Sequence, residues 1–314
     1  MPPDAPVVED AAVPFAVRRI SDSELKRHIL ELAQKPLFIG VEGLKLSLAG
    51  VQEKAAVIVL DEEICLPLSG TPTSHILKPG NARFPALVQN EFLCMRAAVR
   101  MGLRVPAVQI RAAEDQLYLL VARYDREVGA TILRIHQEDF CQALGRREKY
   151  QIFGGPNLKD CFELMMRSSL PVVDRRALMQ AVIFNYLIGN SDAHGKNLSV
   201  IHVRPEFVRL APLYDLVCTQ IYPSVSRDMA MKIGKEYQFD RVSAGDWRKL
   251  AGDAGFSFPA LRQLLQKYLS ELPAAVEVER QALKGTRFDA DELDAIVDFV
   301  RAHCAKTFNR LRDE

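Results

Sequence analysis

The 314-residue sequence lacks several features that define other protein classes. No apolar run reaches the roughly 18 to 20 residues that span a bilayer, and the acidic N-terminal stretch has no basic segment before an apolar core. We therefore expect neither a secretory signal nor a membrane anchor. With 41 Lys and Arg against 40 Asp and Glu, the chain also lacks the net positive charge that is typical of non-specific nucleic-acid binding.

The cysteines of this sequence are scattered. There is no CxxC pair and no histidine at the spacing of a zinc site; His303 is merely adjacent to Cys304. The pattern predicts reduced, mostly buried thiols in a cytoplasmic protein. The six residues are Cys65, Cys94, Cys141, Cys161, Cys218 and Cys304.

The stretch FNYLIGNSDAHGKNLSV, residues 184–200, carries the strongest chemical pattern. It places Asp192 and Asn197 five positions apart, after an apolar helix expected from an N-cap at Asp174 to Gly189. Protein kinases use an Asp as base and an Asn as magnesium ligand at this spacing. An ordinary polar turn contains the same residue types, so the stretch alone leaves both interpretations open.

Two features before this loop fit nucleotide binding. Residues 43–60 read as strand, small-residue turn and strand, which can cover phosphates, although GxGxxG is absent and a plain hairpin would look similar. Lys78 ends a short strand, and Glu91 follows 13 residues later in a helical pattern. Kinases hold a strand lysine against the α- and β-phosphates in this order; the alternative is a surface lysine.

Residues 105–126 read as two strands joined at Glu114-Asp115. The exit of the second strand, Ala122 to Tyr124, is where we expect backbone groups to meet an adenine edge. Helical patterns begin at about His136.

Asp215 lies 23 residues after Asp192, at the end of a second predicted hairpin. A kinase places its second metal-binding aspartate in this position, although one Asp at a strand end is commonplace. Together the patterns predict an α+β, two-lobed kinase-like fold. The expected parts are a mobile segment 1–17, a β-rich N-lobe 18–125 and a helical C-lobe 126–314.

Motifs spread over about residues 44–310 resemble, in the same order, the HipA family of bacterial serine/threonine kinases, the toxins of type II toxin–antitoxin systems. They are LSLAGVQEKAAV, PTSHILKP, NEFLCMRAA, GLRVP, VARYDR, QEDFCQALG with KY, GGP, IGNSDAHGKNLSV and APLYDL. The resemblance implies a serine/threonine protein kinase that uses ATP and Mg²⁺.

The resemblance also implies a role for individual residues. Asp192 would be the catalytic base, Asn197 and Asp215 would hold Mg²⁺, and Ser47 would be the site of an inactivating autophosphorylation. About −2 charge on a loop that cradles phosphates should expel the loop and repel ATP. The implied nucleotide-binding residues are Ala49, Gly50, Val51, Gln52, Glu53, Lys54, Lys78, Ala122, Arg123, Tyr124, His194, Gly195, Lys196, Asn197, Tyr214 and Asp215.

Substrates and partners follow from the same resemblance. The expected substrate is a translation component such as an aminoacyl-tRNA synthetase. The expected inhibitor is a small, HipB-like helix-turn-helix antitoxin. The kinase would contact DNA only indirectly, through this antitoxin. Many members have a Glu at Ala122 and an extra N-terminal subdomain. This sequence has only about 43 residues before its LSLAG segment, like the short toxins of three-component HipBST systems, which adds a separate HipS-like protein as a further expected partner.

Two other functions are compatible with these patterns. A small-molecule kinase of the same fold would carry the same Asp, Asn and Asp set. A catalytically silent module that recruits a repressor is the third hypothesis, and the presence of Lys78, Asp192, Asn197 and Asp215 argues against it.

Overall fold

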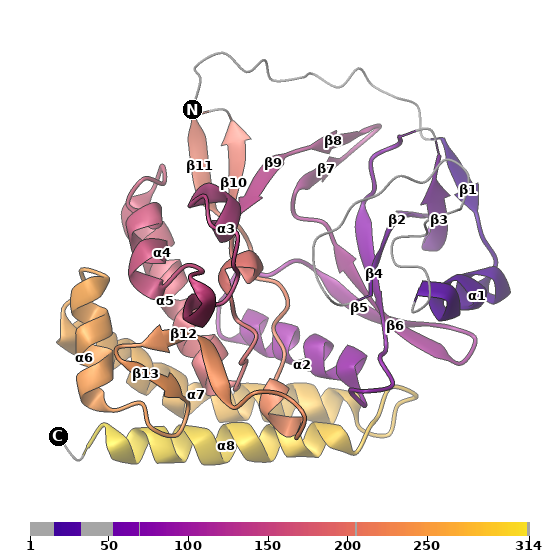
Figure 1. The fold of residues 1–314 in the computed structure, drawn as a ribbon. Helices are drawn as coiled ribbons and strands as arrows, with labels where there is room; N and C mark the ends of the chain where they lie inside the picture. The colour runs from indigo at the N-terminus through magenta and orange to yellow at the C-terminus, as the bar shows by residue number, and fades with distance from the viewer. Residues whose placement is uncertain (1–15, 33–52, 69, 205, 313–314) are drawn as a thin grey trace. The chain divides into compact units, whose positions relative to one another are not determined.

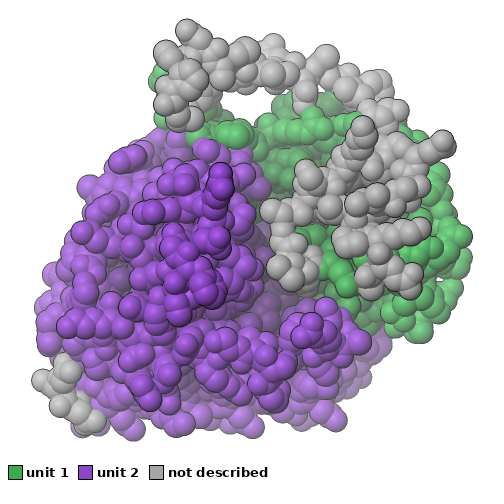
Figure 2. Space-filling model, in the orientation of Figure 1, with its two compact units in different colours: residues 1–80, 107–136, 202–207 green, residues 81–106, 137–201, 208–314 purple. Residues whose placement is uncertain are grey.

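The computed structural model describes residues 16–32, 53–68, 70–204 and 206–312. The chain divides into two compact units, coloured separately in Figure 2. Unit 1 comprises residues 1–80, 107–136 and 202–207, and unit 2 comprises residues 81–106, 137–201 and 208–314. This division interleaves the halves of the chain, so the linear lobes 18–125 and 126–314 stay a prediction. Residues 1–15 of the predicted mobile segment lie outside the described residues.

Unit 1 contains a six-stranded antiparallel sheet in the order β1-β3-β2-β4-β6-β5 (Figure 1). Its apolar core forms where Leu25, Ile29 and Leu32 of the helix α1 pack against sheet residues such as Val57 and Leu77. The elements of this unit are β1 (Val17–Arg19), α1 (Asp22–Leu32), β2 (Ala55–Leu60), β3 (Glu63–Pro67), β4 (His75–Pro79), β5 (Val108–Ala113), β6 (Gln116–Ala122), β7 (Arg126–Val128) and β8 (Ile132–Arg134).

Three further strands form a sheet in the order β11-β10-β9. They are β9 (His136–Asp139), β10 (Ser199–Arg204) and β11 (Phe207–Leu210). The helix expected from His136 is wrong at its start, because His136–Asp139 is a strand and only the single turn α3 (Phe140–Ala143) follows. Sheet pairing outweighs the weak helical pattern here, and Asp139 caps the turn by accepting from the Gln142 N–H at 2.8 Å.

Unit 2 is mainly helical, and its two long C-terminal helices α7 and α8 lie side by side (Figure 1). The helices of this unit are α2 (Leu87–Arg100), α3, α4 (Leu158–Met165), α5 (Pro171–Leu187), α6 (Ala244–Asp253), α7 (Phe258–Leu283) and α8 (Glu292–Arg310). Short 3-10 turns η2 (Gln151–Phe153), η3 (Gly195–Asn197) and η4 (Thr219–Ile221) and the hairpin β12 (Asp228–Ile233) and β13 (Glu236–Gln238) complete it. Within the described ranges, no helix is long and apolar enough to cross a bilayer.

Helix α5 leads directly into the candidate site. Leu178, Ile183, Phe184 and Leu187 are fully buried, as expected for an apolar helix inside the larger lobe. The expected N-cap at Asp174 is wrong: the helix begins at Pro171, a residue suited to the first helical turn. The Asp174 carboxylate is instead buried and accepts from Arg209 Nε at 2.9 Å and Nη2 at 3.1 Å.

Candidate active site

Gly189 redirects the chain at the end of α5. Its φ of +71° is one that L-residues rarely adopt, and a Cβ at this position would lie 2.5 Å from the Phe299 ring and 2.7 Å from Gln220 Cγ. A glycine is therefore required both by conformation and by packing. The loop that starts here carries Asp192 and Asn197.

Asn190 connects this loop to two other parts of unit 2. Its Oδ1 accepts from the Asp192 N–H at 3.1 Å, and its Nδ2 donates to Asn185 Oδ1 at 2.8 Å and to the Asp215 carbonyl at 3.1 Å. The Asn190 side chain is only 3% exposed, so these bonds form away from competing water. The backbones at Asp192 and Asp215 are thus fixed to one another through a single amide.

Thr219, at the start of η4, holds the same loop from another side. Its Oγ1 donates to the Gly189 carbonyl at 2.9 Å and accepts from the Ser191 N–H at 2.8 Å. Both residues 191 and 219 are buried. The loop is therefore fastened on both sides before it reaches Asp192.

Asp192 and Asn197 lie on one hydrogen-bonded turn. The Asp192 carbonyl accepts from Asn197 Nδ2 at 2.8 Å and from the His194 N–H at 2.8 Å. Gly195 lets this turn pack closely, because a Cβ there would lie 2.8 Å from Pro156 and 2.9 Å from Cys141 Sγ. Nδ2 of Asn197 is therefore used by the loop, and metal binding by this side chain would use the amide oxygen Oδ1, because an amide NH2 is not a metal ligand.

Tyr150 contacts the carboxylate of Asp192 directly. Its hydroxyl donates to Asp192 Oδ1, and His194 Nε2 lies 3.6 Å from the same oxygen. The Tyr150 and His194 rings meet edge to face at 5.1 Å, and Lys149 Nζ lies 4.8 Å from the Tyr150 ring centroid. Burial and then the bond to Asp192 raise the pKa of the Tyr150 hydroxyl, which therefore stays protonated as a donor.

Tyr150 was not among the predicted site residues. The only signal in the sequence was the KY pair within the family motifs, 42 positions before Asp192. No spacing rule links two residues so far apart. The fold supplies the contact, because Gly195 N–H donates to the Lys149 carbonyl at 3.2 Å and so joins the segment around Tyr150 to the Asp192 loop.

His194 is buried beside the Asp192 carboxylate. Burial lowers the pKa of the imidazole below its usual value, and the nearby charge of Asp192 only partly opposes this effect. We therefore expect a neutral ring near pH 7. Neutral His194 shapes the wall of the site without adding charge to it.

Asp215 was predicted at the end of a strand, but this is wrong, because β11 ends at Leu210 and Asp215 lies in the irregular segment after it. Its backbone is left-handed. Its φ is +55°, an uncommon value outside glycine that Asp tolerates better than most residues. Such conformations persist where the surroundings fix them and are frequent at functional sites. Here the Asp215 carbonyl is held by Asn190, as described above.

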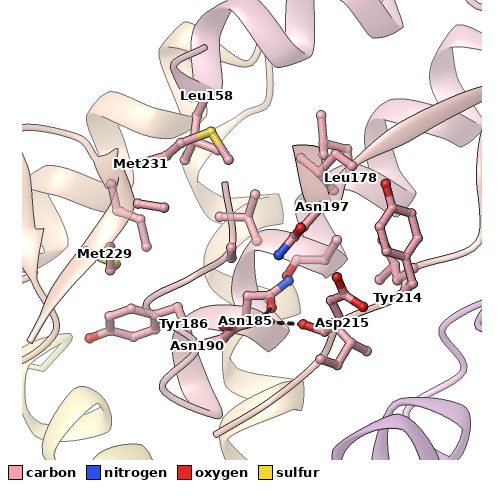
Figure 3. A pocket seen from close by; sticks show the side chains of 18 of the residues that line it. Leu158, Leu178, Asn185, Tyr186, Asn190, Asn197, Tyr214, Asp215, Met229 and Met231 are labelled. Carbon is pink, nitrogen blue, oxygen red and sulfur yellow. Dashed lines mark hydrogen bonds between the residues drawn. The ribbon is translucent and has the colours of Figure 1, made fainter. Parts of the chain in front are cut away.

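Tyr214, just before Asp215, connects back to the loop. Its hydroxyl donates to the Lys196 carbonyl at 2.8 Å and lies 2.5 Å from Ser199 Oγ. Asn197, Tyr214 and Asp215 thus come together from two segments of unit 2. All three line one pocket, of about 50 Å³. Figure 3 shows them together with Met229 and Met231, which also line it.

Asn197 and Asp215 together offer oxygen donors that suit Mg²⁺. An amide oxygen and a carboxylate are hard ligands of the type that magnesium prefers alongside water and phosphate oxygens. Both side chains line the same pocket, together with Asn185 and Asn190. The residues therefore fit the metal that the sequence pattern predicts.

Lys78 lies in unit 1, on β4 opposite Leu119 of β6. It is only 4% exposed, so the alternative of an ordinary surface lysine is excluded. An ammonium group is costly to bury without partners. Glu91 is likewise buried, on α2 in unit 2.

The expected adenine-binding segment follows β6 in unit 1. The Ala122 N–H donates to the Ala107 carbonyl and the Arg123 N–H to the Ser74 carbonyl, both at 2.9 Å. These two donors are therefore used by unit 1 itself, and an adenine would have to be read by other groups of Ala122 to Tyr124.

The Arg123 side chain has a structural partner. It binds Asp125 through Nε at 2.9 Å and Nη2 at 2.6 Å. Burial alone would raise the pKa of the Asp125 carboxyl, but the hydrogen bond and charge of Arg123 hold that pKa below its usual value. Arg126 also donates to Asp125 Oδ2, at 2.7 Å, so the three charged residues of the VARYDR motif bind one another.

The phosphate-covering loop falls largely on residues that the structure does not describe. Ser47, Ala49, Gly50, Val51 and Gln52 lie outside the described residues. Glu53 and Lys54 are described and lead directly into β2.

Comparison with known proteins identifies the family. A family profile for the HipA-like C-terminal domain matches residues 46–278, most of the chain. The chain belongs to this family. It is 41% identical over 286 residues to the putative kinase Y4mE of Sinorhizobium fredii, covering 90% of this chain and 68% of that protein. It is 30% identical over 276 residues to the serine/threonine-protein kinase toxin HipA of Shewanella oneidensis, covering 83% of this chain and 63% of the toxin.

Two solved structures share this fold. HipA of Shewanella oneidensis, solved in a complex with HipB and operator DNA, superposes with a TM-score of 0.85 at 27% identity, covering 97% of this chain and 75% of that one. The Helicobacter pylori proinflammatory kinase CtkA shares the fold, with a TM-score of 0.56 at 12% identity over 86% of this chain and 91% of that one. The predictions of a HipA-family kinase homologue and of an α+β kinase-like fold are therefore confirmed.

Proposed function

We propose that the chain is an ATP- and Mg²⁺-dependent serine/threonine protein kinase and the toxin of a HipA-type toxin–antitoxin system. The observation that carries the proposal is the joint fixation of three residues: Asn197 donates to the Asp192 carbonyl, and Asn190 ties the Asp192 N–H to the Asp215 carbonyl. A base and two metal ligands held rigidly on one side of a site are what phosphoryl transfer requires.

Asp192 is the proposed base. Its side chain is 49% exposed, so a hydroxyl from a separate substrate can reach it, and its proton would pass to the carboxylate as the oxygen attacks the γ-phosphate. Asn197 and Asp215 would hold Mg²⁺, which neutralises developing charge on the phosphates when bound. The remaining nucleotide contacts are assigned to Lys78, to the segments 49–54 and 122–124, and to His194, Gly195, Lys196 and Tyr214.

Regulation and partners belong to the same proposal. Autophosphorylation of Ser47 would switch the kinase off by placing negative charge in the phosphate-covering loop. The proposed substrate is a translation component such as an aminoacyl-tRNA synthetase in the cytoplasm. A HipB-like antitoxin, with or without a HipS-like protein, would restrain the toxin and connect it to DNA; the Shewanella relative was solved with HipB and operator DNA.

A small-molecule kinase is the second candidate, because the half-exposed Asp192 would serve a small hydroxyl substrate equally well. The name of the Shewanella relative, a serine/threonine-protein kinase toxin, favours a protein substrate. The third hypothesis, a binding module without catalysis, is disfavoured. Such a protein does not need the hydrogen bonds that join Asn190, Asp192, Asn197 and Asp215.

The test is phosphate transfer from γ-labelled ATP by the purified chain in the presence of Mg²⁺. We expect the wild-type protein to label itself on Ser47 and the Asp192→Asn variant to remain unlabelled while still binding ATP. Equal labelling of the two proteins would refute the assignment of Asp192. Phosphoproteomics of cells that express the active form or the Asp192→Asn variant would then identify the protein substrate, and purely small-molecule products would favour the second candidate.

A further inference from the structure

The segment Tyr150 to Phe153 combines a contact to the proposed base with two exposed apolar side chains. Tyr150 donates to Asp192 Oδ1. Ile152 and Phe153, on the turn η2, are 62% and 68% exposed. Large apolar side chains next to each other at the surface, close to a functional group, are typical of sites that contact a partner.

The exposed pair is not the result of a loosely held loop. Gln151, between Tyr150 and Ile152, accepts from the Lys232 N–H of β12 through Oε1 at 2.8 Å. The Phe153 and Gly155 N–H groups donate to the Tyr150 carbonyl at 3.1 and 2.9 Å. The backbone is therefore anchored on its inner side while Ile152 and Phe153 face the solvent.

Gly155 makes this anchoring possible. A Cβ there would lie 2.7 Å from the carbonyl oxygens of both Glu148 and Tyr150. The segment after η2 thus packs directly on the backbone before it, and Tyr150 is fixed from both ends.

A line of ring contacts joins the exposed surface to the base. The Phe153 ring meets the Tyr150 ring edge to face at 6.4 Å, and the Tyr150 hydroxyl reaches Asp192. A polypeptide whose Ser or Thr hydroxyl approaches Asp192 would pass this surface within a few residues, since an extended chain advances about 3.3 Å per residue.

We propose that Ile152 and Phe153 form a docking surface for a large apolar side chain of the protein substrate, within a few residues of the phosphorylated Ser or Thr. This inference rests on the proposed kinase function and specifies the class of acceptor: an extended polypeptide segment with an aliphatic or aromatic neighbour to the hydroxyl. Continuity with Asp192 through Tyr150 favours this occupant over a lipid surface or a second copy of the chain.

The test uses the whole 314-residue chain with γ-labelled ATP, Mg²⁺ and a Ser/Thr peptide library in which each flanking position is varied. We expect the wild-type enzyme to select an aliphatic or aromatic residue at one or two flanking positions. In the Ile152→Ser/Phe153→Ser double variant, kcat/KM for the selected peptide should fall roughly tenfold or more, because burial of a large apolar side chain is lost. Peptides with Ser at that position should lose little.

A matched control is the Val172→Ser/Val173→Ser double variant. These residues at the start of α5 are also apolar and exposed, at 79% and 52%, and this variant should retain the wild-type peptide preference. A circular-dichroism melt of each protein verifies folding. If the Ile152/Phe153 variant melts far below the wild type, the milder single variant Phe153→Leu is used instead. Its kcat/KM should fall by less, and only for peptides with an aromatic flanking residue.

The outcomes separate the two proposals. Phosphorylation by the wild type without any flanking preference, or an unchanged preference in the double variant, would overturn the docking surface and leave the kinase function standing. A complete absence of ATP-dependent phosphorylation would overturn both. Loss of binding to phosphatidylcholine–phosphatidylglycerol vesicles with unchanged peptide kinetics would assign the surface to membrane contact instead and also overturn the inference.

Discussion

The Nδ2 group of Asn190 donates to the backbone carbonyl of Asp215 at 3.1 Å while Oδ1 of the same amide accepts from the Asp192 N–H at 3.1 Å. One buried side chain therefore sets the positions of the proposed base and of a proposed metal ligand together. Asn190 itself touches neither phosphate nor acceptor in this assignment, and it is a positioning residue.

We expect Asn190→Ala to lower kcat by about 100-fold, because small displacements of reacting groups can cost that much. Loss of its buried hydrogen bonds should also lower the free energy of unfolding by about 1–3 kcal/mol. Steady-state phosphorylation and urea unfolding measure the two effects. Ser243→Ala, which removes the N-cap of α6 and costs about 1 kcal/mol, is the control for stability: comparable kinetic loss in both variants would argue against a positioning role.

The Tyr150→Phe substitution tests the contact with Asp192. It removes the hydroxyl and keeps the ring against His194 and Phe153. We expect kcat to fall about tenfold, since the carboxylate loses one orienting bond, while KM for the acceptor peptide stays unchanged. A rise in kcat would show instead that the hydroxyl competes with the acceptor for Asp192.

Asn197 is predicted to bind Mg²⁺ through Oδ1 and to brace the Asp192 carbonyl through Nδ2. Asn197→Ala should raise the Mg²⁺ concentration for half-maximal rate at least about tenfold, since even outer-shell partners of a metal are worth about 10- to 100-fold in affinity. Asn197→Asp keeps an oxygen ligand but loses the donor, so its Mg²⁺ requirement should lie nearer the wild type. The measurement is the phosphorylation rate as a function of Mg²⁺ concentration. If Asn197→Ala and the wild type give identical curves, Asn197 is not a metal ligand.

Ser47→Ala should abolish self-inactivation and make expression more toxic to cells. The physical reason is that about −2 charge can no longer be added to the phosphate-covering loop. Growth after induction and mass spectrometry at Ser47 provide the measurement. If Ser47→Ala and wild type arrest growth equally, while Asp192→Asn does not, toxicity is independent of this switch.

His303 should make the protein sensitive to acid. Burial lowers its pKa to about 4, with smaller contributions from the charges of Arg310 and Lys306, and its ring stacks on Phe299 at 5.3 Å. Because the unfolded chain takes up the proton near pH 6.5 and the folded chain only near pH 4, stability falls as pH drops through this window.

At pH 5 this single residue should cost about 2 kcal/mol relative to pH 7. His303→Phe, compared by urea unfolding at pH 7 and pH 5, should lose less stability on acidification than the wild type by that amount. Val300→Ala, a change at a buried residue of the same helix that does not titrate, is the control and should lose as much stability on acidification as the wild type. An equal pH dependence of His303→Phe and wild type would exclude His303 as the source.

The sequence reveals the parts of the site that follow one another at fixed spacing. Asp192, Asn197 and Asp215 could be selected because kinase chemistry prescribes their residue types, order and local surroundings. Asn190 lay within the same stretch but could not be distinguished from a turn-forming residue, since its role depends on Asn185 and Asp215 meeting it in three dimensions. Tyr150 was part of the KY motif, but its contact with Asp192 could not be predicted for the same reason.

Local patterns also misled where tertiary contacts decide. Asp174 has the residue type of an N-cap, yet the helix starts at Pro171, and the buried Asp174 carboxylate inside it pairs with Arg209. Strand β9 arises from sheet pairing that its own sequence, His136–Asp139, does not encode strongly. Residues 81–106 belong to unit 2, although in the sequence they lie between two segments of unit 1. This depends on contacts of α2 with α7, which comes much later in the chain.

All six cysteines are free and buried. Burial raises the pKa of the thiols, to about 11 for Cys141 and about 12 for Cys218 and Cys304. The native chain should thus react slowly with alkylating reagents, and the alkylation rate of each thiol measures how often the structure around it unfolds locally. Pulsed alkylation followed by peptide mapping could therefore compare the opening of unit 1, through Cys65, with that of unit 2, through the other five, in the unmodified protein and as ATP is added.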